Sequence, residues 1–433
     1  MLTSEQNELL TRVEPGSAMG KLLREYWLPA FRSSELPEAD GRPRRLRLLG
    51  EDLVGFRDSD GQVGVVSEYC LHRGASLYYG RNEECGLRCV YHGWKYERGG
   101  HCVDMPNEPP RSRFKEHIRL RAARVVERNN LIWVYLGEGD DPGEPPKLEW
   151  SLVPEPQAVI TKRFTRANWA QVLEGGIDSS HGQFLHRGTI ARGDGRQQDT
   201  HPVYEVADTD YGSLIAARRD LPDAPSHYFW RVYQFLMPFY TMVPGAPDRP
   251  IIGHAFVPRD DVSTIVWSVV WHPTRSVDRD KDLGPGSPLA IHVRDHEEAT
   301  DEADSDYIPL GNRRNDYLLD WERQRAGASF SGIPGIALQD AAMQESMGAI
   351  FNRENEHLGS SDAAILHVRR RWMALARALE AAEGPLELPG VSSPESYLVR
   401  SCSFTLEKAE SWLDSARAPL PARPGPAAKP PVG

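Results

Sequence analysis

The sequence predicts a two-domain α+β protein in which an all-β domain precedes a larger domain that mixes strands with helices. Three observations predict this fold class. The chain has 433 residues, more than a typical single domain. Short strand-like segments with turn signals between them fill residues 44–136, whereas longer strand-like and helical segments share residues 157–415. A charged, proline-rich stretch at 141–156 lies between the two parts and is typical of a linker.

Turn signals and apolar runs define the first domain. One apolar segment ends at the turn 58–61, and a second turn, Asn129-Asn130, precedes the apolar run Leu131–Leu136. We place this domain at 28–140, after an N-terminal helical arm at 1–27. Short strands joined by turns suit a site whose ligands sit in loops.

The second domain contains one clear helix, which begins near Ser360–Asp362 and ends at Gly384-Pro385. The charge run 296–306 is expected to be a solvated loop, and the Pro/Ala-rich tail 416–433 is expected to be disordered. The strand-like stretches of this domain are 214–218, 228–239 and 264–272.

Composition excludes several classes of protein. A net charge of −11 argues against binding to nucleic acid, and no apolar run is long enough to cross a bilayer or to act as a signal peptide. Five cysteines are too few, and odd in number, for a secreted disulfide framework. We therefore expect a reducing, cytoplasmic compartment, with Cys85, Cys102 and Cys402 as reduced bystanders.

Two short motifs, Cys70-Leu71-His72 and Cys89-Val90-Tyr91-His92, offer two thiolates and two imidazoles. Such a set suits zinc or an iron–sulfur cluster. Zinc sites usually begin with a pair of cysteines and end with a pair of histidines, whereas each pair here is mixed. A [2Fe–2S] centre in which two cysteines hold one iron and two histidines the other needs that mixture. The alternative is a structural zinc ion.

The residues that flank these motifs strengthen the assignment. The first motif continues as Arg73-Gly74-Ala75 and the second as Gly93-Trp94. Both loops resemble those of the Rieske proteins, which carry Cys-x-His-Arg-Gly and Cys-x2-His-Gly-Trp. Leu71 departs from that pattern, since the family most often has proline there. The resemblance implies that Cys70, His72, Cys89 and His92 hold a Rieske [2Fe–2S] cluster.

A second motif lies in the other domain, where Asp178 is followed by His181 and His186. Two histidines and a carboxylate are the ligands of a facial triad that leaves open positions on Fe(II) for dioxygen. On an ideal helix a five-residue offset turns the second histidine about 140° from the first, so a helix end or distortion is expected near Gly182. Taken alone, this histidine pair is a weak signal.

After a Rieske-like domain the same spacing resembles the mononuclear-iron motif of the Rieske non-haem iron oxygenases. In that family the two histidines are ligands, and the aspartate bridges to a Rieske histidine of the neighbouring subunit. The resemblance implies that His181 and His186 bind iron and that Asp178 bridges to His92 of another copy.

The third iron ligand is expected far downstream. Residues 339–348 and 352–362 resemble the corresponding segments of the phthalate-dioxygenase-like branch of this family. The resemblance makes Asp340 the best candidate for the carboxylate ligand, and Glu345 the second choice.

The resemblance also implies a fold and an activity. The second domain would be an antiparallel sheet flanked by helices, of the helix-grip or START-like kind. The chain would be a terminal oxygenase that hydroxylates or dihydroxylates an aromatic carboxylate at Fe(II) with O2. Electrons would come from NAD(P)H through a separate flavin/iron–sulfur reductase or ferredoxin, because the chain has no G-x-G-x-x-G loop. Function would require a head-to-tail homo-oligomer, a trimer or stacked trimers.

Other interpretations stay open at this point. Oxidative O-demethylation of a methoxy- or aryloxy-aromatic acid would use the same metal centres. A Rieske electron carrier and a zinc-stabilised binding module are the alternatives from other classes. For the substrate carboxylate the candidate partners are Arg218, Arg219 and Arg231, which lie on strand-like segments. The aromatic residues Phe235, Phe239 and Tyr240 could form pocket walls, although core packing explains them equally well.

Overall fold

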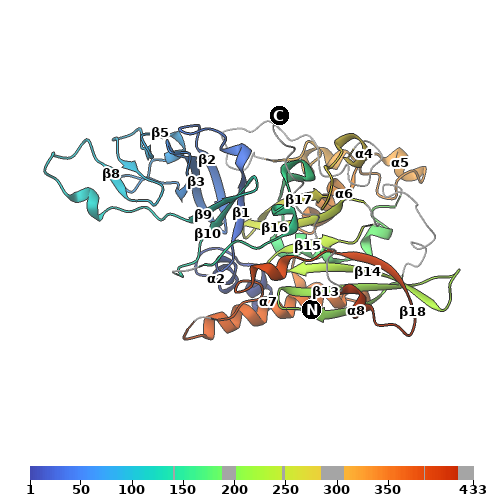
Figure 1. The fold of residues 1–433 in the computed structure, drawn as a ribbon. Helices are drawn as coiled ribbons and strands as arrows, with labels where there is room; N and C mark the ends of the chain where they lie inside the picture. The colour runs from blue at the N-terminus through green and yellow to red at the C-terminus, as the bar shows by residue number, and fades with distance from the viewer. Residues whose placement is uncertain (140–141, 188–200, 246–248, 284–306, 385, 418–433) are drawn as a thin grey trace, which may run out of the picture.

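The computed structural model describes residues 1–139, 142–187, 201–245, 249–283, 307–384 and 386–417. A strand-rich N-terminal domain is followed by a C-terminal domain built on one large antiparallel sheet with helices against it (Figure 1). The expected fold class is therefore confirmed. The expected loop at 296–306 lies outside the described residues, as does the expected tail from residue 418 onward.

The N-terminal arm forms two short helices, α1 (Ser4–Thr11) and α2 (Ala18–Arg24). Thr3 caps the first and Ser17 the second, because each hydroxyl accepts a hydrogen bond from a free backbone N–H of the first turn. Both helices pack against helix α7 (Ala363–Ala381) of the C-terminal domain, so the arm contacts both domains of the chain.

The N-terminal domain contains three small antiparallel sheets among the described residues. The sheet farthest from the C-terminal domain lies at the left of Figure 1, and the two Cys/His loops lie beside it. These loops pack on a small core that includes Phe56, Val66, Leu77 and Tyr96. The strands are β1 (Leu28–Arg32), β10 (Leu131–Tyr135) and β9 (Arg124–Arg128); β2 (Arg44–Leu48), β3 (Glu51–Arg57) and β4 (Val63–Ser67); and β5 (Arg81–Glu83), β6 (Gly86–Arg88), β7 (Lys95–Tyr96) and β8 (Cys102–Asp104).

In the described residues of the C-terminal domain, eight strands form one antiparallel sheet. Helix α3 (Trp169–Ile177) crosses it so closely that a Cβ at Gly176 would lie 2.7 Å from the ring of Phe256. The strands in order are β11 (Ala158–Thr165), β17 (Ser263–Trp271), β16 (Ile251–Asp260), β15 (Tyr240–Val243), β14 (His227–Leu236), β13 (Gly212–Asp220) and β12 (Val203–Asp208), with β18 (Cys402–Glu407) also paired to β14.

Helix α6 (Ile336–Ser346) packs against α3, and helix α7 (Ala363–Ala381) covers both α3 and the N-terminal arm. The start of α7 is as predicted, with Asp362 at its N-cap position, and its buried face includes Val368 and Trp372. The remaining helices are α4 (Arg279–Leu283), α5 (Trp321–Arg325) and α8 (Trp412–Ala416). Within the described residues, no helix combines the length and the apolar character that spanning a bilayer would require.

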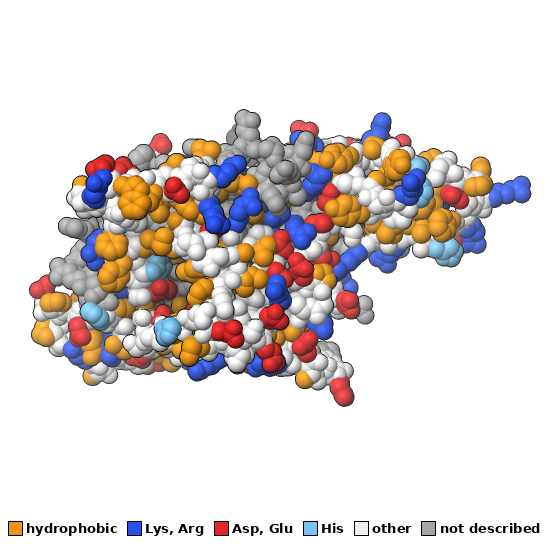
Figure 2. Space-filling model, turned by 180° about the vertical axis from the view of Figure 1, so that it is seen from behind, with side chains coloured by type: hydrophobic (Ala, Val, Ile, Leu, Met, Phe, Trp, Pro, Cys, Tyr) orange, Lys and Arg blue, Asp and Glu red, His pale blue; other side chains and the backbone are white. Residues whose placement is uncertain are grey.

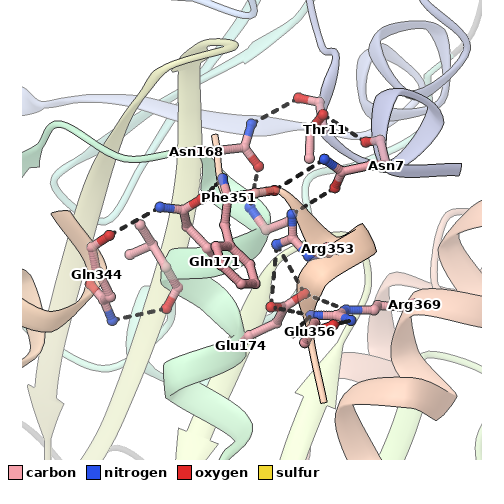
Figure 3. Close-up of polar contacts among 12 residues, drawn as sticks. Asn7, Thr11, Asn168, Gln171, Glu174, Gln344, Phe351, Arg353, Glu356 and Arg369 are labelled. Carbon is pink, nitrogen blue, oxygen red and sulfur yellow. Dashed lines mark hydrogen bonds and ion pairs between the residues drawn. The ribbon is translucent and has the colours of Figure 1, made fainter. Parts of the chain in front are cut away.

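A buried ion-pair network ties these helices together (Figure 3). The Glu174 carboxylate of α3 lies 2.7 Å from Arg369 Nε and 3.3 Å from Arg353 Nη2. Arg369 also pairs with Glu356, and Arg353 donates to Asn7 of α1. Burial alone would raise the pKa of Glu174, but the two guanidinium groups outweigh it and hold that pKa below its usual range. The backbone N–H of Asp178 donates to the Glu174 carbonyl, so this network anchors the end of α3.

Removal of the charge at the centre of this network is expected to be costly. Glu174→Gln leaves Arg353 and Arg369, which are 0% and 1% exposed, with too little compensating charge. We expect a loss of about 3–5 kcal/mol in the free energy of unfolding, measured by denaturant titration. Glu380→Gln removes the exposed pair with Lys21 and should cost less than about 1 kcal/mol. Equal losses in the two variants would contradict this account of the network.

Two candidate metal centres

The two Cys/His loops close in the same way. In each, the cysteine carbonyl accepts a hydrogen bond of 2.9 Å from a glycine N–H four residues later, Gly74 for Cys70 and Gly93 for Cys89. Both glycines have positive φ, +73° and +81°, a conformation that side-chain-bearing residues rarely adopt. The glycines of the motifs are therefore needed to fold the loops around the potential ligands.

These loops gather a donor set that fits a [2Fe–2S] cluster. Cys70 and Cys89 are 2% and 3% exposed, and burial raises the pKa of the Cys70 thiol. The rings of His72 and His92 lie 4.3 Å apart, and His72 is stacked on Trp94. His72 Nδ1 is buried and has no hydrogen-bond partner in the described part of the chain. A buried nitrogen of this kind is what metal coordination would satisfy.

The second histidine pair lies beyond a helix end, as its five-residue spacing requires. Helix α3 ends at Ile177, and His181 begins a short 3-10 turn that leads to His186. The two Nε2 atoms lie 3.1 Å apart. Asp340 Oδ1 lies 3.6 Å from His181 Nε2 and 3.3 Å from His186 Nε2. The three candidate ligand atoms lie within 4.8 Å of one another and could hold one metal ion.

Helix α6 brings Asp340 to the histidines. Arg163 of β11 donates to the Ala337 carbonyl in the first turn of this helix, which ties it to the sheet. Glu345 has other partners, since its carboxylate accepts hydrogen bonds from Tyr317 Oη and from the Arg166 backbone. The structure therefore brings Asp340, and not Glu345, to the two histidines.

The electrostatics of this group suit a divalent cation. Burial alone would raise the pKa of Asp340, but the hydrogen bond with His186 and the charge of His181 outweigh burial, so the pKa is lowered. Two imidazoles with one ionised carboxylate form a mixed N/O donor set of the kind that binds Fe(II) on one face.

Asp178 caps the C-terminus of α3 beside this group. Its Oδ1 accepts from the Ser180 backbone N–H at 2.7 Å and from the Ser180 hydroxyl at 2.8 Å. Its Oδ2 lies 3.5 Å from His181 Nδ1. One oxygen is therefore held by the turn, while the other faces the outer nitrogen of a candidate iron ligand.

An open cavity of about 750 Å³ lies beside Asp178 and His181. Its lining is mostly apolar. Figure 2, which views the molecule from behind, shows hydrophobic side chains gathered around a hollow in the C-terminal domain. The Cys/His loops of the same chain lie at the opposite end of the molecule (Figure 1). The exposed apolar residues of the cavity are Phe184, Phe330, Met343 and Met347.

The structure places the three candidate arginines differently. Arg219 of β13 faces α3, is 2% exposed, and lies 3.4 Å from the Ser179 hydroxyl. Arg231 shares that face of the sheet but donates to the Pro244 carbonyl. Arg218 points to the other face and packs over the ring of Tyr228. Only Arg219 therefore reaches a residue adjacent to Asp178.

Two residues that contact candidate ligands were not predicted from the sequence. Tyr96 Oη lies 3.3 Å from Cys70 Sγ, and Gln339 Oε1 lies 2.7 Å from His186 Nδ1. Gln339 directly precedes Asp340 on α6, and that adjacency was the one available signal. The aromatic candidate Phe235 packs in the core against Trp372.

Both domains match known families. Residues 26–122 match the family described as Rieske [2Fe-2S] domain, and residues 134–418 match the family described as LigXa C-terminal domain like. The chain belongs to the Rieske oxygenases. The resemblance seen in the motifs is thereby confirmed over nearly the whole chain.

Relatives of this Rieske oxygenase are similar over almost their full length. The 3-chlorobenzoate-3,4-dioxygenase oxygenase subunit of Comamonas testosteroni is 40% identical, with 95% of this chain and 97% of that protein covered. The phthalate 4,5-dioxygenase oxygenase subunit of Pseudomonas putida is 36% identical, with 96% and 94% covered. The fold is also similar to that of dicamba monooxygenase, with a TM-score of 0.60 at 19% identity over 83% of this chain and 99% of that one.

Membership of the family establishes the class of enzyme and its cofactors. The protein is an oxidoreductase that incorporates O2, with a Rieske [2Fe–2S] cluster and a mononuclear iron. As an oxygenase subunit it receives electrons from a separate electron-transfer partner.

Loss of one histidine should remove one metal only. His186→Ala is expected to lower the iron content from about three to about two per chain, with two acid-labile sulfides and the cluster spectrum retained. His227→Ala, a catalytic-domain histidine outside the group, should keep all three irons. The assignment of His186 fails if its alanine variant also keeps three.

Proposed function

We propose that this chain is a terminal oxygenase that hydroxylates or dihydroxylates an aromatic carboxylate. Cys70, His72, Cys89 and His92 would hold the cluster, and His181, His186 and Asp340 would hold the iron. When bound, the cluster supplies electrons one at a time and the iron activates O2 at its open positions. The convergence of the three ligand atoms within 4.8 Å, beside Asp178, is the observation that carries this proposal.

We also propose that Asp178 connects the iron of one chain to the cluster of another. Its Oδ2 already faces His181, and it lines the open apolar cavity. Around His92 the loops present exposed apolar side chains, Leu71, Val90 and Tyr91, that could be buried in such a cavity. Because the cluster loops of the same chain lie at the other end of the molecule, the partner would be a second copy. Head-to-tail pairing of this kind closes into a ring, a trimer or stacked trimers.

Arg219 supports an aromatic carboxylate as the substrate class. Its guanidinium is buried and reaches Ser179, the residue after Asp178, and a guanidinium is suited to a charge-assisted, bidentate hydrogen bond with a carboxylate. The names of the two relatives described above mention chlorobenzoate and phthalate, both aromatic carboxylates. Arg218, on the opposite face of the sheet, has no such support.

Oxidative O-demethylation is the second candidate, because another relative is a 5,5'-dehydrodivanillate O-demethylase oxygenase subunit from Sphingobium. Both reactions need the same metal centres and differ in whether a ring carbon or a methyl carbon lies over the iron. Product analysis separates them, since demethylation releases formaldehyde and a phenol whereas dihydroxylation gives a diol.

The organisation of the chain follows from these roles. We infer an arm at 1–27, a cluster domain at 28–140, a linker at 141–156 and an iron domain at 157–415. The electrons would come from NAD(P)H through a flavin/iron–sulfur reductase or a ferredoxin. We place the protein in the cytoplasm, where its five cysteines would stay reduced.

Removal of the charge at Asp178 tests the connecting role. Asp178→Asn should keep both metals, because neither set of ligands changes, but should lower turnover by about 100-fold. Metal content and steady-state oxygenation are measured on the same preparation. Asp362→Asn changes another carboxylate that lines the cavity and should keep most of the activity. Full activity of the Asp178 variant would refute the connecting role.

A matched arginine pair tests the substrate class. Loss of a charge-assisted hydrogen bond costs about 1.5–3 kcal/mol, so Arg219→Gln should raise KM for an aromatic acid by about 10–100-fold. 3-Chlorobenzoate and phthalate are suitable first probes. Arg218→Gln should change KM little, since Arg218 faces away from the site. Equal effects of the two substitutions would remove the support for a carboxylate anchor at Arg219.

A further inference from the structure

The Nδ1 atoms of the two candidate iron-binding histidines contact different side chains. His181 Nδ1 faces the Asp178 carboxylate at 3.5 Å, beside the open cavity. His186 Nδ1 lies 2.7 Å from Gln339 Oε1, and both of these side chains are buried. The contact between His186 and Gln339 is the shorter of the two and is shielded from water. It therefore restricts the orientation of its imidazole ring more strongly than the contact between His181 and Asp178 does.

The orientation of the Gln339 amide follows from its other hydrogen bond. Its Nε2 lies 2.8 Å from the Ile333 carbonyl, which can only accept a hydrogen bond. The amide nitrogen therefore faces Ile333, and the amide oxygen faces His186. Since that oxygen can only accept, His186 Nδ1 carries the proton, which leaves Nε2, the nitrogen next to Asp340, as the atom that a metal ion would bind.

We propose that Gln339 is a positioning residue, which holds His186 in the tautomer and the orientation needed to bind the mononuclear metal. This inference rests on the proposed ligand set. Because Gln339 and Asp340 are adjacent on α6, one turn of helix supplies both a ligand and the group that orients another ligand.

The neutrality of Gln339 has a physical reason. Asp340 among the candidate ligands and Asp178 behind His181 already supply two carboxylates, which would match the charge of a divalent cation. A glutamate at position 339 would add a third negative charge at a fully buried position, and one of its oxygens would face the Ile333 carbonyl. An amide orients the imidazole without either penalty.

The test is the affinity of the mononuclear site for Fe(II). The site is emptied with a chelator that leaves the cluster in place, and Fe(II) is then returned by anaerobic equilibrium dialysis. Gln339→Leu should bind Fe(II) about 10–100-fold more weakly than the unaltered protein, with an unchanged cluster spectrum. Gln339→Glu keeps an acceptor for Nδ1 but loses the Ile333 bond, so it should recover part of the affinity.

Gln344→Leu is the matched control. Gln344 is a buried glutamine of the same helix, and its amide donates to the Val172 carbonyl and not to a ligand. Its leucine variant should bind Fe(II) as the unaltered protein does. Undiminished affinity in Gln339→Leu would overturn the proposal, and so would an equal loss in Gln344→Leu. Undiminished affinity in His186→Ala would instead overturn the proposed ligand set.

Discussion

The packing of helix α3 against helix α6 is the constraint on which the iron site depends. The Gln171 side chain donates to the backbone carbonyls of Gln344 and Gly348 at 3.0 and 2.8 Å (Figure 3). Gln171 is buried, where an unpaired amide would be costly, so these hydrogen bonds set how the two helices lie against each other. The distance from Asp340 to the two histidines follows from that geometry.

The same helix pair links the iron site to its surroundings. At the far end of α3, Asp178 faces both His181 and the open cavity, and Glu174 anchors the preceding turn between two buried arginines. On α6, Gln339 and Asp340 contact His186 from the opposite side. Electrons from a second copy would therefore reach the site from the α3 side, and α6 covers the opposite side of the candidate ligand atoms.

Much of the candidate site could be predicted from the sequence, because metal chemistry depends on residue types at short spacings. The cluster loops and the His181/His186 pair are of this kind. Asp340 lies far along the chain and was reached through the family resemblance. Gln339 was not predicted, since its place beside Asp340 was the one signal and its proposed role depends on a contact with His186 across the fold. Strand alternation predicts that Arg218 and Arg219 point to opposite faces of the sheet, but only the packing shows which of them faces α3.

The central claim is that one chain holds both a Rieske cluster and a mononuclear iron. It is tested most directly by iron and acid-labile sulfide analysis, with a visible spectrum, on anaerobically purified protein. The account predicts about three irons and two sulfides per chain and a red-brown colour. Two irons per chain that do not rise to three on addition of Fe(II), or zinc without sulfide, would contradict it.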